Sequence, residues 1–298
     1  MNWEKEARFA AFRYLSDLAM YNSVFSGKFL AEGFEWHGRR ITLKGQTGIW
    51  TPKGFECPIS ITSRTNGPYN LDGIGKDGTI TYAYRGTDPN QRDNRNMRRA
   101  LETRTPLIFF KEVLNHHYQA IWPVLIIEDY PDKLFVKAVI EPAYNNLQPD
   151  TSWEDFQVSS ADVRRYAMVE TRHRLHQSAF RELVLHAYSE RCTMCNLHHP
   201  NLLDAAHIIP DSDEDGVPEI TNGLSLCKIH HAAFDHNILG IDPDYTVHVR
   251  EDILSESDGP MLQYGLKALD SKKIILPRRR ADWPDRNFLE RKYQQFMG

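Results

Sequence analysis

Four soft or imidazole ligands occur as two closely spaced pairs in the C-terminal half of the sequence. Cys192 and Cys195 form a C-x-x-C pair, and Cys227 and His230 form a C-x-x-H pair. Two such pairs supply the tetrahedral sulfur and nitrogen set that structural Zn²⁺ takes, so we expect a zinc site. A disulfide is disfavoured in a reducing cytoplasm. The remaining alternative is that the thiols are ordinary small core residues. The remaining cysteine, Cys57, is expected to be simply buried.

A second set of polar residues lies between and just after these pairs. The sequence contains DAAHIIP, which begins at Asp204, and TNGLSLCKIHHAAFD, which ends at Asp235. These stretches resemble the HNH, or ββα-metal, nucleases, with His207 as the first histidine, Asn222 as the asparagine and His231 as the last histidine. Asp235 follows His231 by four residues, so the two side chains would share one helix face and could hold one divalent cation.

The resemblance implies hydrolysis of a phosphodiester bond. A neutral imidazole can deprotonate water near neutral pH, so His207 would be the general base. A divalent cation such as Mg²⁺ or Mn²⁺, held by His231 and Asp235, would stabilise charge on the phosphorus and on the leaving oxygen. Asn222 would orient the loop that carries the base, and in some family members this asparagine touches the metal.

The sequence departs from the family pattern at Ala206. In many HNH enzymes the residue before the base histidine is an Asp or His that binds the metal. Strand alternation puts Asp204 on the same face as position 206, so Asp204 is predicted to replace that ligand. Without a substitute, metal binding would be weak or the enzyme crippled. The bordering histidines are expected to be structural: His198, His199 and His236.

The elements that must position these residues belong to a chain of two globular domains. Its 298 residues suffice for two separate cores. Hydrophobic residues make up 41% and charged residues 26%, as in ordinary globular proteins. No apolar run reaches the roughly 18 residues of a membrane span, and the N-terminal stretch has the period of an amphipathic helix instead of a signal peptide. We therefore expect a cytoplasmic protein without membrane contact.

The formal net charge of −4 counts against a nucleic-acid binder. Phosphate contacts, however, depend on local basic clusters more than on total charge. Arginines cluster in three stretches, 85–104, 164–181 and 278–280. Each could be a solvated face, but beside a nuclease motif they become candidate contacts to the DNA backbone. From the first stretch we single out four residues: Arg85, Arg92, Arg95 and Arg98.

Hydrophobic patterning divides the chain into four segments. Residues 1–40 contain one or two amphipathic helices, and residues 41–142 hold short β-like runs separated by Gly, Pro, Asn and Asp. Residues 143–160 are turn-rich and form the expected linker. Residues 161–298 begin with a long basic helix that leads into the first cysteine pair. The expected fold class is α+β, with a twisted β-sheet or barrel followed by a ββα-metal domain.

A second resemblance, carried by shorter and more degenerate motifs, lies within residues 63–101. Tyr69, Asp72, Gly78 and Tyr82 follow the pattern of the SRA domain, and the stretch that begins at Asn94 resembles the family's NxNRAL helix start. The SRA domain is a PUA-like β-barrel that flips modified cytosines out of DNA. The resemblance therefore implies such a barrel over about 100 residues, with the first 40 residues outside it.

In that family arrangement, Tyr69 and Tyr82 would sandwich the flipped base, and Asp72 would accept a hydrogen bond from its exocyclic amine. The basic stretch after Arg85 would hold the distorted backbone. The alternative is that both tyrosines are hairpin core or turn residues and that Asp72 is a turn former before Gly73.

Together, the two resemblances imply a type IV-like, modification-dependent restriction endonuclease of the SRA–HNH, or McrA-like, kind. Its substrate would be double-stranded DNA with 5-methylcytosine or 5-hydroxymethylcytosine, cut with Mg²⁺ or Mn²⁺ beside a structural Zn²⁺. Cutting of both strands by a single-site nuclease favours a homodimer. Two alternatives stay open. One is an HNH nuclease guided by phosphorothioate linkages, DNA structure or RNA, and the other is a modified-DNA reader whose HNH fold is only a zinc-stabilised scaffold.

Overall fold

The computed structural model describes residues 3–19, 24–64, 73–75, 79–141 and 159–298. The chain divides into two compact units, Met1–Ser178 and Ala179–Gly298. The division falls inside helix α4 (Ala161–Ala187), so each unit holds one part of that helix. The linker predicted at 143–160 lies outside the described residues except for its last two positions.

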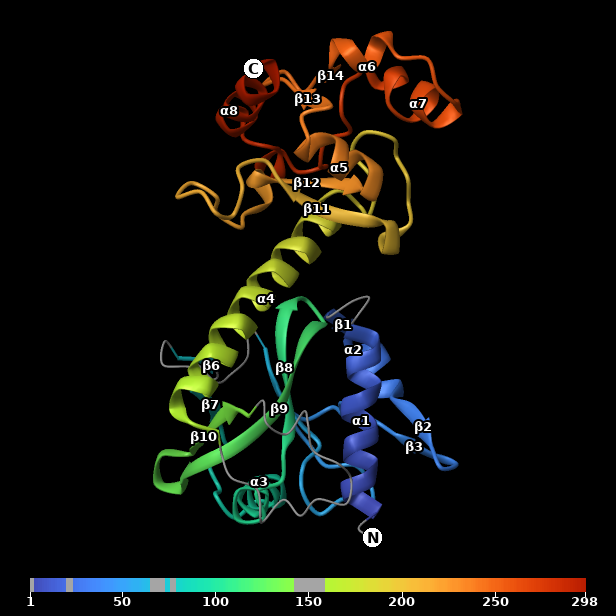
Figure 1. The fold of residues 1–298 in the computed structure, drawn as a ribbon. Helices are drawn as coiled ribbons and strands as arrows, with labels where there is room; N and C mark the ends of the chain where they lie inside the picture. The colour runs from blue at the N-terminus through green and yellow to red at the C-terminus, as the bar shows by residue number, and fades with distance from the viewer. Residues whose placement is uncertain (1–2, 20–23, 65–72, 76–78, 142–158) are drawn as a thin grey trace. The chain divides into compact units, whose positions relative to one another are not determined.

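The first unit is built on one mixed sheet (Figure 1), in the order β4-β5-β8-β9-β10-β7-β6, with β1 also paired to β9. The pairs are antiparallel except β5 with β8. The end strands β4 and β6 do not pair with each other among the described residues, so the predicted barrel is not seen to close. The strand bounds are β1 Val24–Ser26, β4 Ile49–Trp50, β5 Ser60–Ser63, β6 Gly73–Ile74, β7 Ile80–Ala83, β8 Leu107–Leu114, β9 His117–Tyr130 and β10 Phe135–Ile140.

Strand alternation in β8 supplies a core on each face of this sheet. Phe109 packs in a cluster with Met97 of helix α3 (Arg92–Glu102), whereas Phe110 packs in a cluster with Leu15 of helix α1 (Trp3–Ala19). Because both faces are covered, the strand sequence is a continuous apolar run instead of an alternating one. The same α1 cluster includes residues from helix α2 (Gly27–Glu32) and the hairpin of β2 (Phe34–Trp36) and β3 (Arg39–Ile41).

Helix α1 is anchored by a fully buried arginine. Arg8 donates hydrogen bonds to the carbonyl oxygens of Pro58, at 2.7 Å, and Pro106, at 3.1 Å, and pairs with Glu4 at 2.8 Å. These bonds pair both terminal nitrogens of the guanidinium, which offsets part of the cost of burying its charge. The N-terminal helical segment is therefore part of the core of the first unit.

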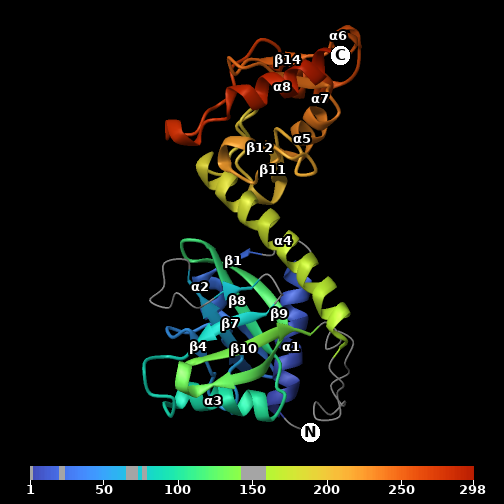
Figure 2. The same cartoon turned by 90° about the vertical axis from the view of Figure 1, so that its left-hand side faces the viewer.

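The second unit packs the end of α4 onto a ββα arrangement (Figure 2) of β11 (Leu203–His207), β12 (Gly223–Cys227) and α5 (Lys228–Asp235). Phe180 and Val184 of α4 share one core with Leu203, Leu224 and Phe234. The remaining elements of this unit are β13 Leu239–Ile241, β14 Val247–Val249, α6 Glu251–Ser255, α7 Pro260–Gly265 and α8 Arg286–Met297. Single 3-10 turns are η1 Pro131–Lys133 in the first unit, and η3 Pro200–Leu202, η4 Ile220–Asn222, η5 Lys267–Leu269 and η6 Arg280–Asp282 in the second.

None of the described helices combines the length and apolar character that a bilayer span requires. The β-like runs expected within residues 41–142 are present as strands, among them β7 to β10, and the long helix expected from residue 161 is present as α4.

Candidate active site and metal centre

The ββα arrangement is set by antiparallel pairing of β11 with β12, in which His207 lies opposite Gly223. The glycine is required by the close approach of α4, because a Cβ atom at Gly223 would lie 2.4 Å from Cγ2 of Val184 and 3.0 Å from the ring of Phe180. This approach brings α4 against the end of β11, where His207 is placed.

His207 stacks on the ring of Phe180, with ring centroids 3.9 Å apart and an angle of 13° between the planes. Its Nε2 atom is buried and has no hydrogen-bond partner within the described part of the chain. Burial lowers the pKa of His207, and the charges of Asp211 and Asp235 oppose this effect only in part. The imidazole is therefore neutral near pH 7, which is the state that a general base needs.

Asn222, at the end of η4, holds the loop that follows His207. Its side chain is fully buried, accepts a hydrogen bond from the Ile209 amide at 2.8 Å, and donates to the carbonyls of Ile209 and Val217, both at 3.0 Å. These three bonds join the two ends of the loop 209–217. The asparagine therefore tethers the loop that follows His207.

His231 lies on α5 between two carboxylates. Its Nδ1 atom is 3.4 Å from Oδ2 of Asp204 on β11, and its Nε2 atom is 3.3 Å from Oδ2 of Asp235 one helical turn later. The hydrogen bond to Asp204 raises the pKa of His231. The structure thus brings together the three side chains predicted to surround the catalytic cation, although the two carboxylates contact different ring nitrogens.

Lys228 also contacts Asp204, a contact that the sequence does not predict. Its Nζ atom donates to both carboxylate oxygens at 2.6 Å. Hydrogen bonds from His231 and then from Lys228 lower the pKa of Asp204 to about 2, although partial burial acts in the opposite direction. Asp204 is therefore ionised at any physiological pH. Ala206, on the same strand, is fully buried in the core of the unit.

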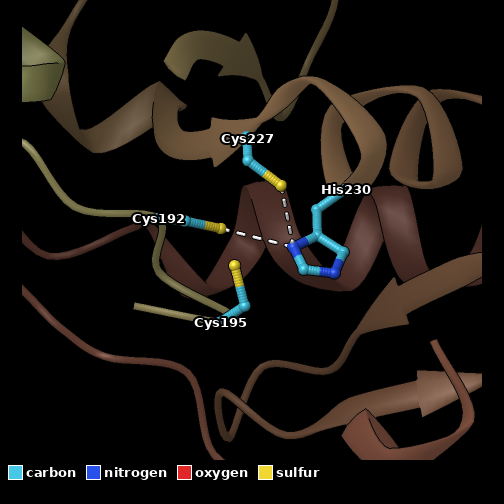
Figure 3. Close-up of side chains that lie close together, drawn as sticks. All are labelled: Cys192, Cys195, Cys227 and His230. Carbon is cyan, nitrogen blue, oxygen red and sulfur yellow. Dashed lines mark hydrogen bonds between the residues drawn. The ribbon is translucent and has the colours of Figure 1, made fainter. Parts of the chain in front are cut away.

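The two cysteine pairs form one cluster, as predicted (Figure 3). The ligand atoms of Cys192, Cys195, Cys227 and His230 all lie within 4.8 Å of one another. Nδ1 of His230 is 3.4 Å from the sulfur of Cys192 and 3.3 Å from that of Cys227. Three thiols and one imidazole are a donor set that fits tetrahedral zinc. Hydrogen bonds from Cys192 and Cys195 lower the pKa of the Cys227 thiol, whereas hydrogen bonds within the same network raise the pKa of Cys195.

The orientation of the His230 ring supports a metal-binding role. Its Nε2 atom lies 2.7 Å from the carbonyl oxygen of Gly265, at the end of α7. A carbonyl oxygen only accepts, so Nε2 carries a proton, and Nδ1 is the nitrogen that faces the sulfurs of Cys192 and Cys227 and would bind a metal. Metal-bound histidines are commonly oriented by such a bond from the other ring nitrogen.

The predicted base pocket of the first unit lies largely outside the described residues, which omit Tyr69, Asp72 and Gly78. Tyr82 on β7 is 4% exposed, packs in the core of the sheet, and donates a hydrogen bond to the Thr62 carbonyl at 3.2 Å. Tyr82 is therefore packed as a core residue, which is the alternative to a base-pocket role that the sequence leaves open.

The helix start predicted near Asn94 is present as α3. Asn94 is fully buried, accepts a hydrogen bond from the Arg85 amide at 2.9 Å and donates to the carbonyls of Arg85 and Asp88. It thereby fixes the turn between β7 and α3.

The four arginines singled out for backbone contact differ in their surroundings. Arg85 pairs with Asp93 at 2.7 Å, and Arg98 is 3.4 Å from Asp129. Arg92 and Arg95, on the same helix as Arg98, are exposed. The exposed pair is therefore better placed to meet a phosphate than Arg98 is.

Two contacts of the site were not anticipated from the sequence, the Phe180 ring under His207 and the Lys228 ammonium on Asp204. Lys228 precedes His231 by three residues on one helix, and this spacing indicates that the two side chains lie on the same face. Phe180 lies 27 positions before His207, and its contact depends on the packing of α4, which no local pattern reveals.

Comparison with known proteins locates the family resemblance in this unit. The model of the HNH endonuclease family matches residues 192–242, a range that includes both cysteine pairs, His207 and Asp235. No curated protein matches the chain.

Among solved structures, the chain is similar to the modification-dependent restriction endonuclease TagI, at 18% identity and a TM-score of 0.29, over 84% of this chain and 85% of that one. It is also similar to the type IV phosphorothioation-dependent restriction endonuclease ScoMcrA, at 15% identity and a TM-score of 0.24, over 85% of this chain and 56% of that one. With the family match and the ββα geometry in agreement, residues 192–242 are an HNH endonuclease domain.

Proposed function

We propose that the protein is a modification-dependent DNA endonuclease that hydrolyses phosphodiester bonds at its HNH domain. The observation that carries the nuclease activity is the neutral His207, whose buried Nε2 atom has no partner within the described residues, together with the His231–Asp235 pair on α5. A proton acceptor and a ligand pair for a divalent cation are the two requirements of this hydrolysis.

In the proposed mechanism, His207 accepts the proton of the attacking water at its imidazole nitrogen. Phe180 holds the ring in place by stacking, and Asn222 fixes the loop that follows the base. His231 and Asp235 would hold a divalent cation, Mg²⁺ or Mn²⁺, which would supply Lewis-acid stabilisation of the negative charge that develops during hydrolysis.

The Cys192, Cys195, Cys227 and His230 cluster is proposed to hold a structural Zn²⁺ with no part in the chemistry. All four positions are taken by protein ligands, and a closed tetrahedral set leaves none for water or substrate. Cys227 and His230 flank the start of α5, so the ion would fix the helix that carries His231.

We further propose that the first unit selects DNA with 5-methylcytosine or 5-hydroxymethylcytosine by flipping the base. The support is the sequence pattern around Tyr69 and Asp72, with Asp72 as acceptor for the exocyclic amine. One HNH domain per chain would cut one strand at a time, which supports a homodimer on double-stranded DNA.

A cleavage panel tests this proposal and separates the alternatives. Duplexes of one sequence containing cytosine, 5-methylcytosine, 5-hydroxymethylcytosine or a phosphorothioate linkage are incubated with the protein and Mg²⁺ or Mn²⁺, and with His207→Ala as a blank. Cutting confined to the modified-cytosine duplexes is the expected result. Equal cutting of every duplex would overturn the selection of modified bases, and cutting of the phosphorothioate duplex alone would favour that other mark. No cutting with either ion would favour the scaffold alternative.

A further inference from the structure

The two carboxylates beside His231 do not converge on one point. Asp204 lies at Nδ1 and Asp235 at Nε2, and the two nitrogens of an imidazole point away from each other. A metal ion binds one of these nitrogens, so only one of the two carboxylates can share that ion directly. Among the described residues, Cys192, Cys195, Cys227 and His230 form a group whose ligand atoms converge closely enough to hold one metal ion. Asp204, His231 and Asp235 do not form a second such group.

The contacts of Asp204 distinguish the two carboxylates. Both of its oxygens accept from Lys228 at 2.6 Å, and one also faces His231, so its acceptors are already engaged by two donors. Asp204 is 25% exposed, whereas the side chain of Asp235 is 55% exposed and open to an ion from solvent. Asp235 also lies on the side of the base, because its charge acts on His207.

We propose that Asp204 is a positioning residue instead of a metal ligand, and that Lys228 holds it in that role. Asp204 accepts the proton of His231 Nδ1, which fixes the tautomer whose Nε2 lone pair faces Asp235 and the cation. Lys228 donates to both oxygens of Asp204 and keeps that carboxylate at Nδ1. A carboxylate that orients a metal-bound histidine in this way is a general device of metal sites. The inference rests on the proposed nuclease site and reassigns Asp204, which the sequence offered as the replacement for the ligand missing at Ala206.

A positioning residue and a metal ligand are expected to respond differently when the carboxylate is replaced by an amide. The amide oxygen of Asn still accepts from an imidazole N–H, but it is a much poorer ligand than a carboxylate. Asp204→Asn is therefore expected to keep most of the affinity for the cation, while Asp235→Asn loses it. Asp204→Ala removes the acceptor and is expected to weaken binding by about 10- to 100-fold, the effect seen when the orienting partner of a metal ligand is removed.

The test is a titration of zinc-loaded, full-length protein with Mn²⁺ in the absence of DNA, followed by calorimetry or by the Mn²⁺ electron paramagnetic resonance signal. The expected order of affinity is wild type, Asp204→Asn, Asp204→Ala, Asp235→Asn. Equal loss of Mn²⁺ in Asp204→Asn and Asp235→Asn would overturn the positioning role, and so would absence of Mn²⁺ binding by the wild type. Zinc content and thermal unfolding of each variant confirm that it is folded.

A second measurement reads the tautomer without any catalytic ion. The ¹⁵N chemical shifts of His231 in zinc-loaded protein are expected to show a protonated Nδ1 and an unprotonated Nε2 at high pH, and a mixture of tautomers in Asp204→Ala. A protonated Nε2 in the wild type would overturn the proposal. Because neither measurement involves DNA, failure of the nuclease assay and failure of this inference are distinguishable.

Discussion

His207 combines a buried nitrogen with an aromatic ring that fixes its plane. The stacking on Phe180 excludes water from one face of the imidazole, and burial disfavours its charged form. A base prepared in this way needs no partner to deprotonate it before the reaction.

His207→Ala is expected to lower the single-turnover cleavage rate by about 10²- to 10⁴-fold, the usual contribution of a general base. Folding and DNA binding should be unchanged, because His207 makes no hydrogen bond through Nε2 that the described fold depends on. Rate, thermal unfolding and DNA affinity are measured on the same preparation. Undiminished cleavage by the variant would refute the assignment of the base.

The pH profile of cleavage follows from the lowered pKa of His207. The base works in its neutral form, and burial makes protonation harder, so activity should persist to lower pH than an ordinary histidine allows. We expect the acid limb of kcat/KM to have its midpoint below about pH 6.5. The measurement is made at fixed free Mg²⁺ concentration with the zinc site saturated. A midpoint above that value would contradict the environment described for this imidazole.

At the scale of elements, the zinc cluster ties the segment before β11 to the start of α5. Cys192 and Cys195 come from the turn after α4, and Cys227 and His230 come from the β12–α5 junction. Structural zinc contributes directly to folding free energy in small units of this kind.

Cys195→Ser is accordingly expected to lower the zinc content below one ion per chain and to lower the unfolding temperature of the second unit. Cleavage should fall with it, and added Mg²⁺ should not restore it, because the loss is structural. Zinc analysis and calorimetry of the variant check this outcome, with Cys57→Ser in the first unit as the matched control. Full zinc occupancy in Cys195→Ser would contradict the ligand set.

The contact between α4 and β12 gives a prediction about packing. Gly223→Ala puts a methyl group 2.4 Å from Val184, and relief of such overpacking costs on the order of 1–3 kcal/mol. Gly259→Ala is the control, since nothing lies within 4 Å of a Cβ atom there. Denaturant unfolding of both variants measures the difference, and equal stability would show that α4 does not approach β12 as described.

At the scale of the whole molecule, the groupings that the sequence anticipated are those that depend on local spacing. The Cys192–Cys195, Cys227–His230 and His231–Asp235 pairs follow from spacings of three or four residues, and the structure brings the members of each pair together. Likewise, the strand runs within 80–141 were predicted because continuous apolar stretches bounded by turns are typical of sheets covered on both faces.

Non-local arrangements could not be predicted in this way. The parallel pairing of β5 with β8, and a sheet whose end strands β4 and β6 do not pair with each other among the described residues, depend on register between distant segments. The engagement of Lys228 with Asp204 depends on how α5 packs against β11. For the same reason, the enclosure of Tyr82 in the core could not be distinguished from a place in a pocket.

Modification-dependent cleavage requires that the first unit recognise the modified base and that the second unit hydrolyse the DNA. The two functions should then separate by mutation, with Asp72→Ala losing selection and His207→Ala losing cutting. The most direct test is the ratio of single-turnover cleavage rates on a modified-cytosine duplex and on the same duplex unmodified. We predict a ratio well above ten for the wild type, on the order of 1.4 kcal/mol or more of discrimination, and a ratio near one for Asp72→Ala. A ratio near one for the wild type would contradict the account.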